Sequence, residues 1–254
     1  MMKNKKSVTG ERTLENYLYT SDKARMYALV CDMMNEACRN LERAVKALEE
    51  SDLALADQVI QNDEKVDELE ERIDQECLYS IAMRQPLRED LRYVYAVMKI
   101  VIDIERIGDQ AVNLALRLKG YIDEYGGAAP LLKVDIMKEL CRIYSACAED
   151  FLQSLKVEDG GFLQRMKVKH DETALTCNST ADLLMHRLTS PYLTDAPTTI
   201  FITVDIFRHL KRVSDHLINL AEKVYFISTG ISPRTLKKHS DSASYAEPSN
   251  LAKL

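Results

Sequence analysis

The sequence has 254 residues, a formal net charge of -6 at pH 7, and only 8 glycines and 6 prolines. A chain of this length can bury one full hydrophobic core or two small ones, and the scarcity of glycine and proline permits long helices. The acidic balance disfavours a general nucleic-acid-binding protein, because such proteins need a basic face. No apolar run reaches the roughly 18 residues that indicate a membrane-spanning helix, so we expect no direct membrane insertion.

In the first half of the chain, apolar residues recur at the three- and four-residue steps of a helix. The pattern predicts three helices, at about residues 27–50, 53–83 and 89–125. The expected breaks are Ser51-Asp52, Pro86 and Gly126-Gly127, because serine and aspartate cap helices whereas proline and glycine end them. Residues 1–24 are predicted to be a polar lead-in that lacks the apolar segment of a secretory signal.

The second half repeats this plan, with helices predicted at about residues 131–156, 162–190 and 197–229. No stretch alternates with the two-residue period of a strand. We therefore predict an all-α fold of six long antiparallel helices in two tandem, similar three-helix bundles. The predicted boundaries are 25–128 for the first bundle, 129–231 for the second, and 232–254 for a tail whose polar composition predicts disorder.

One run of residues occurs twice and indicates a duplication. Asp103 to Asn113 reads DIERIGDQAVN, and His209 to Asn219 reads HLKRVSDHLIN. The period is about 105 to 108 residues, and two upstream pairs match it to within a residue or two: Pro86 with Pro191, and Asp63 with Asp171. A period this long indicates a duplicated domain and not a solenoid of short repeats.

Glu105 and Asp109 are one helical turn apart, so both carboxylates lie on the same face of the third predicted helix. A helical wheel places them in line with an apolar stripe that includes Leu91 and Leu116, while Gln110 falls on a different arc. Carboxylates at such a position need a cation or a hydrogen-bond donor. Two hard oxygen donors one turn apart suit Mg²⁺, Mn²⁺, iron or Ca²⁺. The alternative is that they pair with an arginine on a neighbouring helix.

The second copy keeps the aspartate as Asp215 but has Lys211 in place of Glu105. An ammonium group four residues before Asp215 is expected to pair with it directly and to repel a metal ion. The two sites should therefore not be equivalent. His209 and His216, about two turns apart, allow a soft metal-binding face, and the alternative is that both are solvated or hydrogen-bonded.

Several motifs that would indicate an enzyme are absent from the sequence. It contains no Gly-rich phosphate loop, no Gly-x-Ser-x-Gly and no pairing of a nucleophile with a base. The absence of Glu-x-x-His disfavours a ferritin-like di-iron bundle. The six cysteines fall in helical patterns without Cys-x-x-Cys spacing, so we expect free thiols in a reducing compartment. We therefore expect a binding protein and not an enzyme.

Three short runs resemble the PhoU family of phosphate-uptake regulators: Met83-Arg84-Gln85-Pro86, Asp90-Leu91-Arg92, and Glu105-Arg106-Ile107-Gly108-Asp109 followed by Asn113. The resemblance extends over residues 25–230 and implies two similar three-helix bundles side by side. It also implies a metal motif in each bundle, in which an acid is followed four residues later by aspartate. Carried over, the metal ligands are Glu105, Asp109 and Asp215, for iron, zinc, manganese or magnesium, and Lys211 departs from the motif.

The resemblance further implies a cytoplasmic negative regulator of phosphate uptake and phosphate-starvation signalling. Such a regulator would act between the phosphate ABC transporter and the sensor histidine kinase, and would be held at the inner face of the membrane through these partners. A homodimer is expected, because long helical bundles leave apolar-edged faces. Two alternatives for a divergent PhoU-type chain are a metal-buffering protein and a purely structural helical adaptor, although Lys211 argues against buffering.

Overall fold

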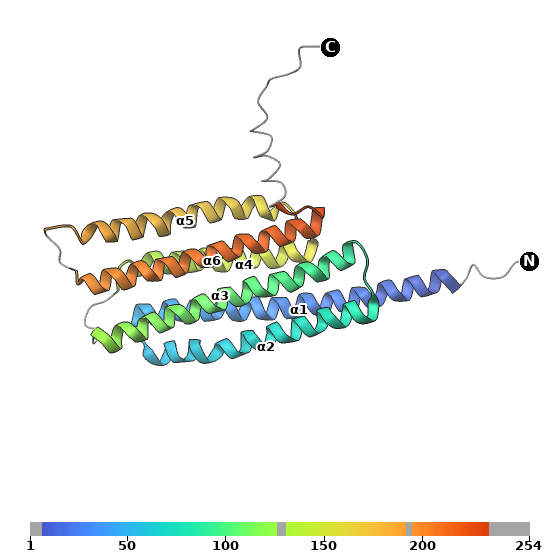
Figure 1. Ribbon diagram of the computed structural model, residues 1–254, viewed down its shortest axis with the longest axis horizontal. Helices are drawn as coiled ribbons and strands as arrows, with labels where there is room; N and C mark the ends of the chain where they lie inside the picture. Colours follow the sequence, from blue (N-terminus) through green and yellow to red (C-terminus); the bar gives the residue numbers. More distant parts are fainter. Residues whose placement is uncertain (1–6, 126–130, 192–194, 234–254) are drawn as a thin grey trace, which may run out of the picture.

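Six helices make up almost all of the computed structural model within the residues it describes, 7–125, 131–191 and 195–233 (Figure 1). They are α1 (Ser7–Glu50), α2 (Leu53–Arg84), α3 (Glu89–Tyr125), α4 (Val134–Val157), α5 (Phe162–Arg187) and α6 (Pro197–Thr229). No strand occurs within these ranges. The predicted all-α fold is confirmed.

The helices form two adjacent bundles (Figure 1). The first consists of α1, α2 and α3, each of which packs against the other two. The second consists of α4, α5 and α6, in which α6 packs broadly on α5 and less on α4. α3 and α6 run antiparallel side by side through the middle of the molecule, and α1 contacts α4. The two bundles therefore share an interface built from four helices.

Local sequence explains where the helices end. Asp52 is the N-cap of α2, and its side chain accepts a hydrogen bond from the Leu55 backbone N–H at 3.0 Å. Gln85 ends α2 in the left-handed region, with φ of 50°, and donates its backbone N–H to the Ile81 carbonyl. Gly230 ends α6 at φ of 75°, a conformation that costs glycine little because it has no Cβ.

The predicted lead-in was wrong in one respect, because α1 begins at Ser7 and not near Tyr27. Between these two positions the sequence contains no proline, and Gly10 is the only glycine. Isolated glycines are tolerated in helices, so the chain has no strong stop signal there. The polar composition had suggested a lead-in, but a polar segment can also be helical.

Two further boundaries differ from the predicted ones. α4 begins at Val134 and α5 ends at Arg187, each inside its predicted range. Lys133 precedes α4 in the left-handed region at φ of 61°, which interrupts helical geometry. The predicted Gly126-Gly127 break and the part of the predicted tail beyond residue 233 lie outside the described residues.

The duplicated halves share one pattern of buried positions. In α2 these positions are Ala56, Val59, Val66, Ile73 and Cys77, and in α5 the same spacing gives Leu163, Met166, Thr173, Thr180 and Leu184. This alignment makes His170 the counterpart of Asp63. The sequence comparison had paired Asp63 with Asp171, one residue away. The alignment by burial is the one that the packing supports, since it places these five buried positions of α2 on five buried positions of α5.

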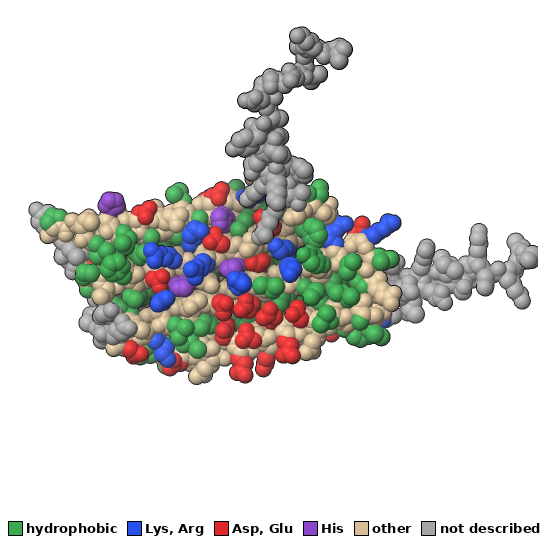
Figure 2. All heavy atoms as spheres, viewed as in Figure 1, with side chains coloured by type: hydrophobic (Ala, Val, Ile, Leu, Met, Phe, Trp, Pro, Cys, Tyr) green, Lys and Arg blue, Asp and Glu red, His purple; other side chains and the backbone are tan. Residues whose placement is uncertain are grey.

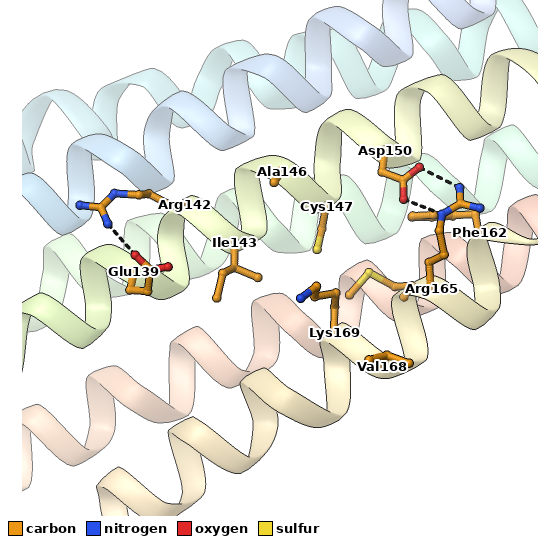
Figure 3. Close-up of a pocket in the computed structure, with 11 residues that line it drawn as sticks. Glu139, Arg142, Ile143, Ala146, Cys147, Asp150, Phe162, Arg165, Val168 and Lys169 are labelled. Carbon is orange, nitrogen blue, oxygen red and sulfur yellow. Dashed lines mark hydrogen bonds and ion pairs between the residues drawn. The ribbon is translucent and has the colours of Figure 1, made fainter.

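We call the line of contact between two neighbouring helices a seam. The second bundle is open along the seam between α4 and α5. α4 and α5 meet over a much smaller contact than α5 and α6, and a groove of about 630 Å³ lies between them (Figure 3). Its apolar lining includes Ile143, Phe162 and Met166. At one end Arg165 of α5 reaches α4 and donates to both carboxylate oxygens of Asp150, at 2.8 and 2.9 Å. In the first bundle, the equivalent seam between α1 and α2 is closed.

None of the described helices combines the length and the apolar character needed to cross a membrane. The six cysteines are free thiols, as predicted. Burial raises the pKa of Cys38, Cys77 and Cys141 to about 12. These three thiols therefore stay protonated near neutral pH and are weak nucleophiles.

Candidate metal site and the contacts between the bundles

The seam between α2 and α3 has a close approach at Gly108. A Cβ placed on Gly108 would lie 3.5 Å from Oδ1 of Asp63 and 3.5 Å from Cγ1 of Val66. A Cβ would be in ordinary van der Waals contact at these distances, so α2 and α3 lie against each other here. The carboxylate of Asp63 lies near enough to Asp109 for the two charges to repel each other.

Six carboxylates line this seam, and we call them the acidic seam: Asp63, Asp67, Glu70 and Asp74 of α2, with Glu105 and Asp109 of α3. Figure 2 shows acidic side chains gathered in one patch over these two helices, next to a row of lysine and arginine side chains. Within the described part of the chain, none of the six carboxylates forms an ion pair or accepts a hydrogen bond. The predicted alternative, a salt bridge to an arginine on a neighbouring helix, is not found for Glu105 or Asp109 among these residues.

Burial and neighbouring carboxylates raise the pKa of several residues of the acidic seam. Burial, followed by the charges of Asp109 and Glu70, raises the pKa of Glu105 to about 7. Burial, followed by Asp67 and Asp109, raises the pKa of Asp63 to about 6. Each of these groups therefore holds a proton more tightly than a solvated carboxyl, which means that the seam stabilises added positive charge.

By donor type, the acidic seam suits a hard cation such as Mg²⁺ or Mn²⁺, because it offers only carboxylate oxygens. Its geometry is not that of a closed site. No group of three or more His, Cys, Asp or Glu side chains within the described ranges is placed to hold a metal ion. A cation bound by Glu105 and Asp109 would therefore need side-chain rotation to gain a third ligand from α2.

Sequence reasoning found Glu105 and Asp109 but missed Asp63, Asp67 and Glu70 as their neighbours. A signal was present, since the acids of α2 recur at three- and four-residue steps and so share one face. Nothing in the spacing of a single helix shows which neighbouring helix that face meets, because this depends on tertiary packing.

The second copy has a different chemistry at the same position. The Lys211 ammonium donates to both carboxylate oxygens of Asp215, at 2.9 and 3.0 Å, as the four-residue spacing predicted. Nε2 of His170, on α5, lies 3.0 Å from Oδ1 of Asp215. Burial alone would raise the pKa of Asp215, but the bonds from Lys211 and His170 outweigh it and lower that pKa. The expectation that Asp215 binds metal stays a prediction, and both of its oxygens already have partners.

The two histidines of α6 bind side chains of α3 across the interface between the bundles. Nδ1 of His216 lies 3.0 Å from Oδ1 of Asp103, and the Asn219 amide donates to the same oxygen at 2.9 Å. Nδ1 of His209 lies 2.9 Å from Oε1 of Gln110. Of the two alternatives for these histidines, the structure shows the hydrogen-bonded one.

These contacts are reciprocal in terms of the repeat. Asp103 and His209 occupy the same position in the two copies, as do Gln110 and His216. The first position in one copy therefore contacts the second position in the other copy: Asp103 meets His216, and His209 meets Gln110. A local two-fold relation between α3 and α6 produces this arrangement, as it would at the interface of a symmetric dimer. Contacts at the helix ends fit the same antiparallel arrangement. Near one end, Arg92 donates to the Ile227 carbonyl, and near the other, the hydroxyls of Tyr121 and Thr199 are 2.8 Å apart.

The helical wheel assigned three residues of α3 to the wrong environment. Gln110 is buried against α6, although the wheel placed it on an arc away from the apolar stripe. Leu91 and Leu116, placed in the apolar stripe, are 43% and 49% exposed. The reason is that α3 is central and contacts α1, α2 and α6, so its buried surface is wider than one stripe and is partly polar.

Comparison with known proteins agrees with the fold. The PhoU domain family matches residues 30–118. A phosphate-specific transport system accessory protein PhoU homolog of Pseudomonas putida is 31% identical, over 77% of this chain and 75% of its own. PhoU homolog 1 of Thermotoga maritima is 27% identical, over 84% of this chain and 87% of its own.

Two solved structures are similar in fold. The phosphate transport system regulatory protein PhoU from Streptococcus pneumoniae superposes with a TM-score of 0.74 at 16% identity, over 84% of this chain and 98% of its own. PhoU from Pseudomonas aeruginosa superposes with a TM-score of 0.65 at 25% identity, over 86% and 99%. Fold and sequence thus define a protein of two duplicated three-helix bundles. The chain belongs to the PhoU family.

Proposed function

We propose that this protein regulates phosphate uptake as an accessory protein of a phosphate-specific transport system. The names of its relatives support this role, since they are accessory proteins of such systems and the alignments cover most of both chains. We further propose that it is a negative regulator, not an enzyme, and acts between the phosphate ABC transporter and a sensor histidine kinase. The cytoplasmic location and the homodimer expected from the sequence stay predictions.

We also propose that the acidic seam binds a divalent or trivalent metal ion through Glu105 and Asp109. The observation that carries this proposal is that six carboxylates share one seam and, among the described residues, none of them forms an ion pair. A cation there would offset the burial and the repulsion that raise the pKa of Glu105 and Asp63. The all-oxygen donor set favours magnesium, manganese or iron over zinc. The metal would act by fixing the relative position of α2 and α3.

The first test is genetic. We expect deletion of the gene from its host to raise alkaline phosphatase activity in phosphate-rich medium, and restoration of the gene to lower it again. This is the result expected of a repressor of the phosphate-starvation response. Unchanged activity after deletion would contradict the regulatory role and would favour a structural adaptor.

The second test concerns the metal. The double variant Glu105→Gln with Asp109→Asn should lose bound Mn²⁺ in equilibrium dialysis and remain helical by circular dichroism. The matched control is Glu64→Gln with Glu68→Gln, which removes the same charge at the same spacing from exposed positions of α2. The control should keep its metal. Full metal content in the first variant would exclude Glu105 and Asp109 as ligands.

A further inference from the structure

The packing lets every position of the acidic seam be located in the second bundle. In the first bundle, Gly108 of α3 faces Val66 of α2. In the second, Ser214 of α6 faces Thr173 of α5, with their hydroxyl oxygens 2.7 Å apart. Ser214 is the repeat counterpart of Gly108, and Thr173 occupies the buried position that matches Val66. The two seams are therefore aligned by contact as well as by sequence.

On this alignment, most of the acids have been replaced. The counterparts of Asp63, Asp67, Glu70, Asp74, Glu105 and Asp109 are His170, Ala174, Cys177, Ala181, Lys211 and Asp215. One carboxylate remains of six, and two positions that carry an acid in the first bundle carry a basic side chain in the second. The two basic side chains are the ones that contact the remaining carboxylate.

The contacts around Asp215 resemble those expected around a bound cation. The Lys211 ammonium lies 2.9 and 3.0 Å from the two oxygens of Asp215, so it faces the carboxylate symmetrically. His170 approaches Oδ1 from α5 and so joins the two helices of the seam. The side chains of Lys211 and Asp215 are 34% and 40% exposed, so the pair is partly shielded. A lysine one turn away is always present, whereas a metal ion must be taken from solution and dehydrated.

We propose that the Lys211 ammonium is the resident cation of the second bundle: together with His170 it takes the place of a metal ion beside Asp215. The second seam is then joined without metal, and divalent ions act on the first bundle alone. The chain would thus hold one exchangeable cation and one permanent one. The functional meaning of this asymmetry rests on the proposed metal site of the first bundle, but the claim about Asp215 can be tested without it.

The test uses the full chain in a background where the first site is removed, Glu105→Gln with Asp109→Asn. Into this background Lys211→Glu and His170→Asp are introduced, which restores the acids found at the equivalent positions of the first bundle. Binding of Mn²⁺ alone is measured by equilibrium dialysis and elemental analysis. We expect no Mn²⁺ in the background protein and about one ion per chain after the two changes, since three carboxylates would then face one point. We also expect Mn²⁺ to raise the thermal midpoint of the changed protein only.

Two further variants make the result interpretable. Lys211→Arg in the same background keeps a cation beside Asp215 and should bind no Mn²⁺. Lys211→Glu alone is a milder change, to be used if the protein with both changes is not helical by circular dichroism, and it should bind Mn²⁺ more tightly than the background.

Two results would overturn the proposal. One is Mn²⁺ binding by the background protein that disappears on Asp215→Asn, because Lys211 would then not exclude a metal. The other is a folded Lys211→Glu protein that binds no more Mn²⁺ than the background. Neither result depends on the first site. Absence of Mn²⁺ from the wild-type chain would contradict only the metal site at Glu105 and Asp109.

Discussion

The first and second bundles have the same helical plan but differ in how their seams are held. In the first, α1, α2 and α3 enclose a core with all three seams closed, and the acidic seam between α2 and α3 carries unpaired charge. In the second, α4 and α5 leave a groove, and the seam between α5 and α6 is joined by Lys211, Asp215 and His170. Duplicated scaffolds can therefore keep most of their buried positions while their charges diverge, because most of the charged side chains lie on a different face of each helix from the core.

The difference in closure has a consequence for stability. α5 is attached mainly through α6, while α2 is attached through both α1 and α3. Regions with fewer buried contacts open with a smaller free energy. We therefore expect α5 to exchange its backbone amide hydrogens faster than α2.

The largest expected effect comes from breaking the core of the second bundle. Phe151 of α4 is fully buried, and its ring lies 6.3 Å from that of Phe162 at the edge of the groove. Phe151→Ala should lower the free energy of unfolding by about 3–5 kcal/mol, measured by urea denaturation. Hydrogen exchange should show the loss of protection first in α4 and α5. Equal loss in α1 and α2 would mean that the two bundles unfold as one unit.

A smaller effect is expected at the contact between the bundles. Asp103→Ala removes the acceptor shared by His216 and Asn219, which leaves two polar groups without a partner in a largely buried interface. We expect a loss of about 1–3 kcal/mol in the free energy of unfolding. Asp103→Asn keeps an acceptor of the same shape and should lose less. If the two variants were equally unstable, the negative charge and not the hydrogen bond would be the important feature.

The smallest effects are expected to have opposite signs at equivalent positions. At pH 8, Asp109→Asn should raise the free energy of unfolding, because it removes repulsion in the acidic seam, while Asp215→Asn should lower it, because it removes the partner of Lys211. Each change should be at most about 1 kcal/mol, since both seams are partly exposed to solvent. Thermal denaturation of the two single variants measures both effects, and equal signs would contradict the contrast between the seams.

The pH dependence sharpens this comparison. The folded-state pKa of Glu105, about 7, lies above the ordinary value of 4.5. The burial of this carboxylate and, after it, the repulsion from Asp109 and Glu70 therefore lower stability fully above about pH 7, and this cost disappears below about pH 4.5. The pKa of Asp215 is lowered below 3.8, so its contribution is present above pH 3.8 and is lost as the pH falls through the folded value. Glu105→Gln should thus stabilise the protein at pH 8 but not at pH 4, as followed by the thermal midpoint.

The sequence predicted those features that depend on one helix at a time. The apolar period located six helices, and the spacing of Lys211 and Asp215 predicted their ion pair. The division into two bundles also followed from the repeat, because each copy carries the same plan of three helices. Features that need two helices were missed. His170 meets Asp215 from α5, and Gln110 is buried only because α6 covers it. The groove could not be predicted either, since it depends on how far apart α4 and α5 lie.

The reciprocal pairing of α3 with α6 sets a condition on how the two seams could come to differ. At an interface between two identical chains, any substitution appears on both sides at once, so a lysine in one seam would be accompanied by a lysine in the other. Here the two halves are parts of one polypeptide, and each position mutates independently. Covalent fusion therefore permits an arrangement that a symmetric dimer cannot have, with Glu105 on one side of the pseudo-two-fold axis and Lys211 on the other.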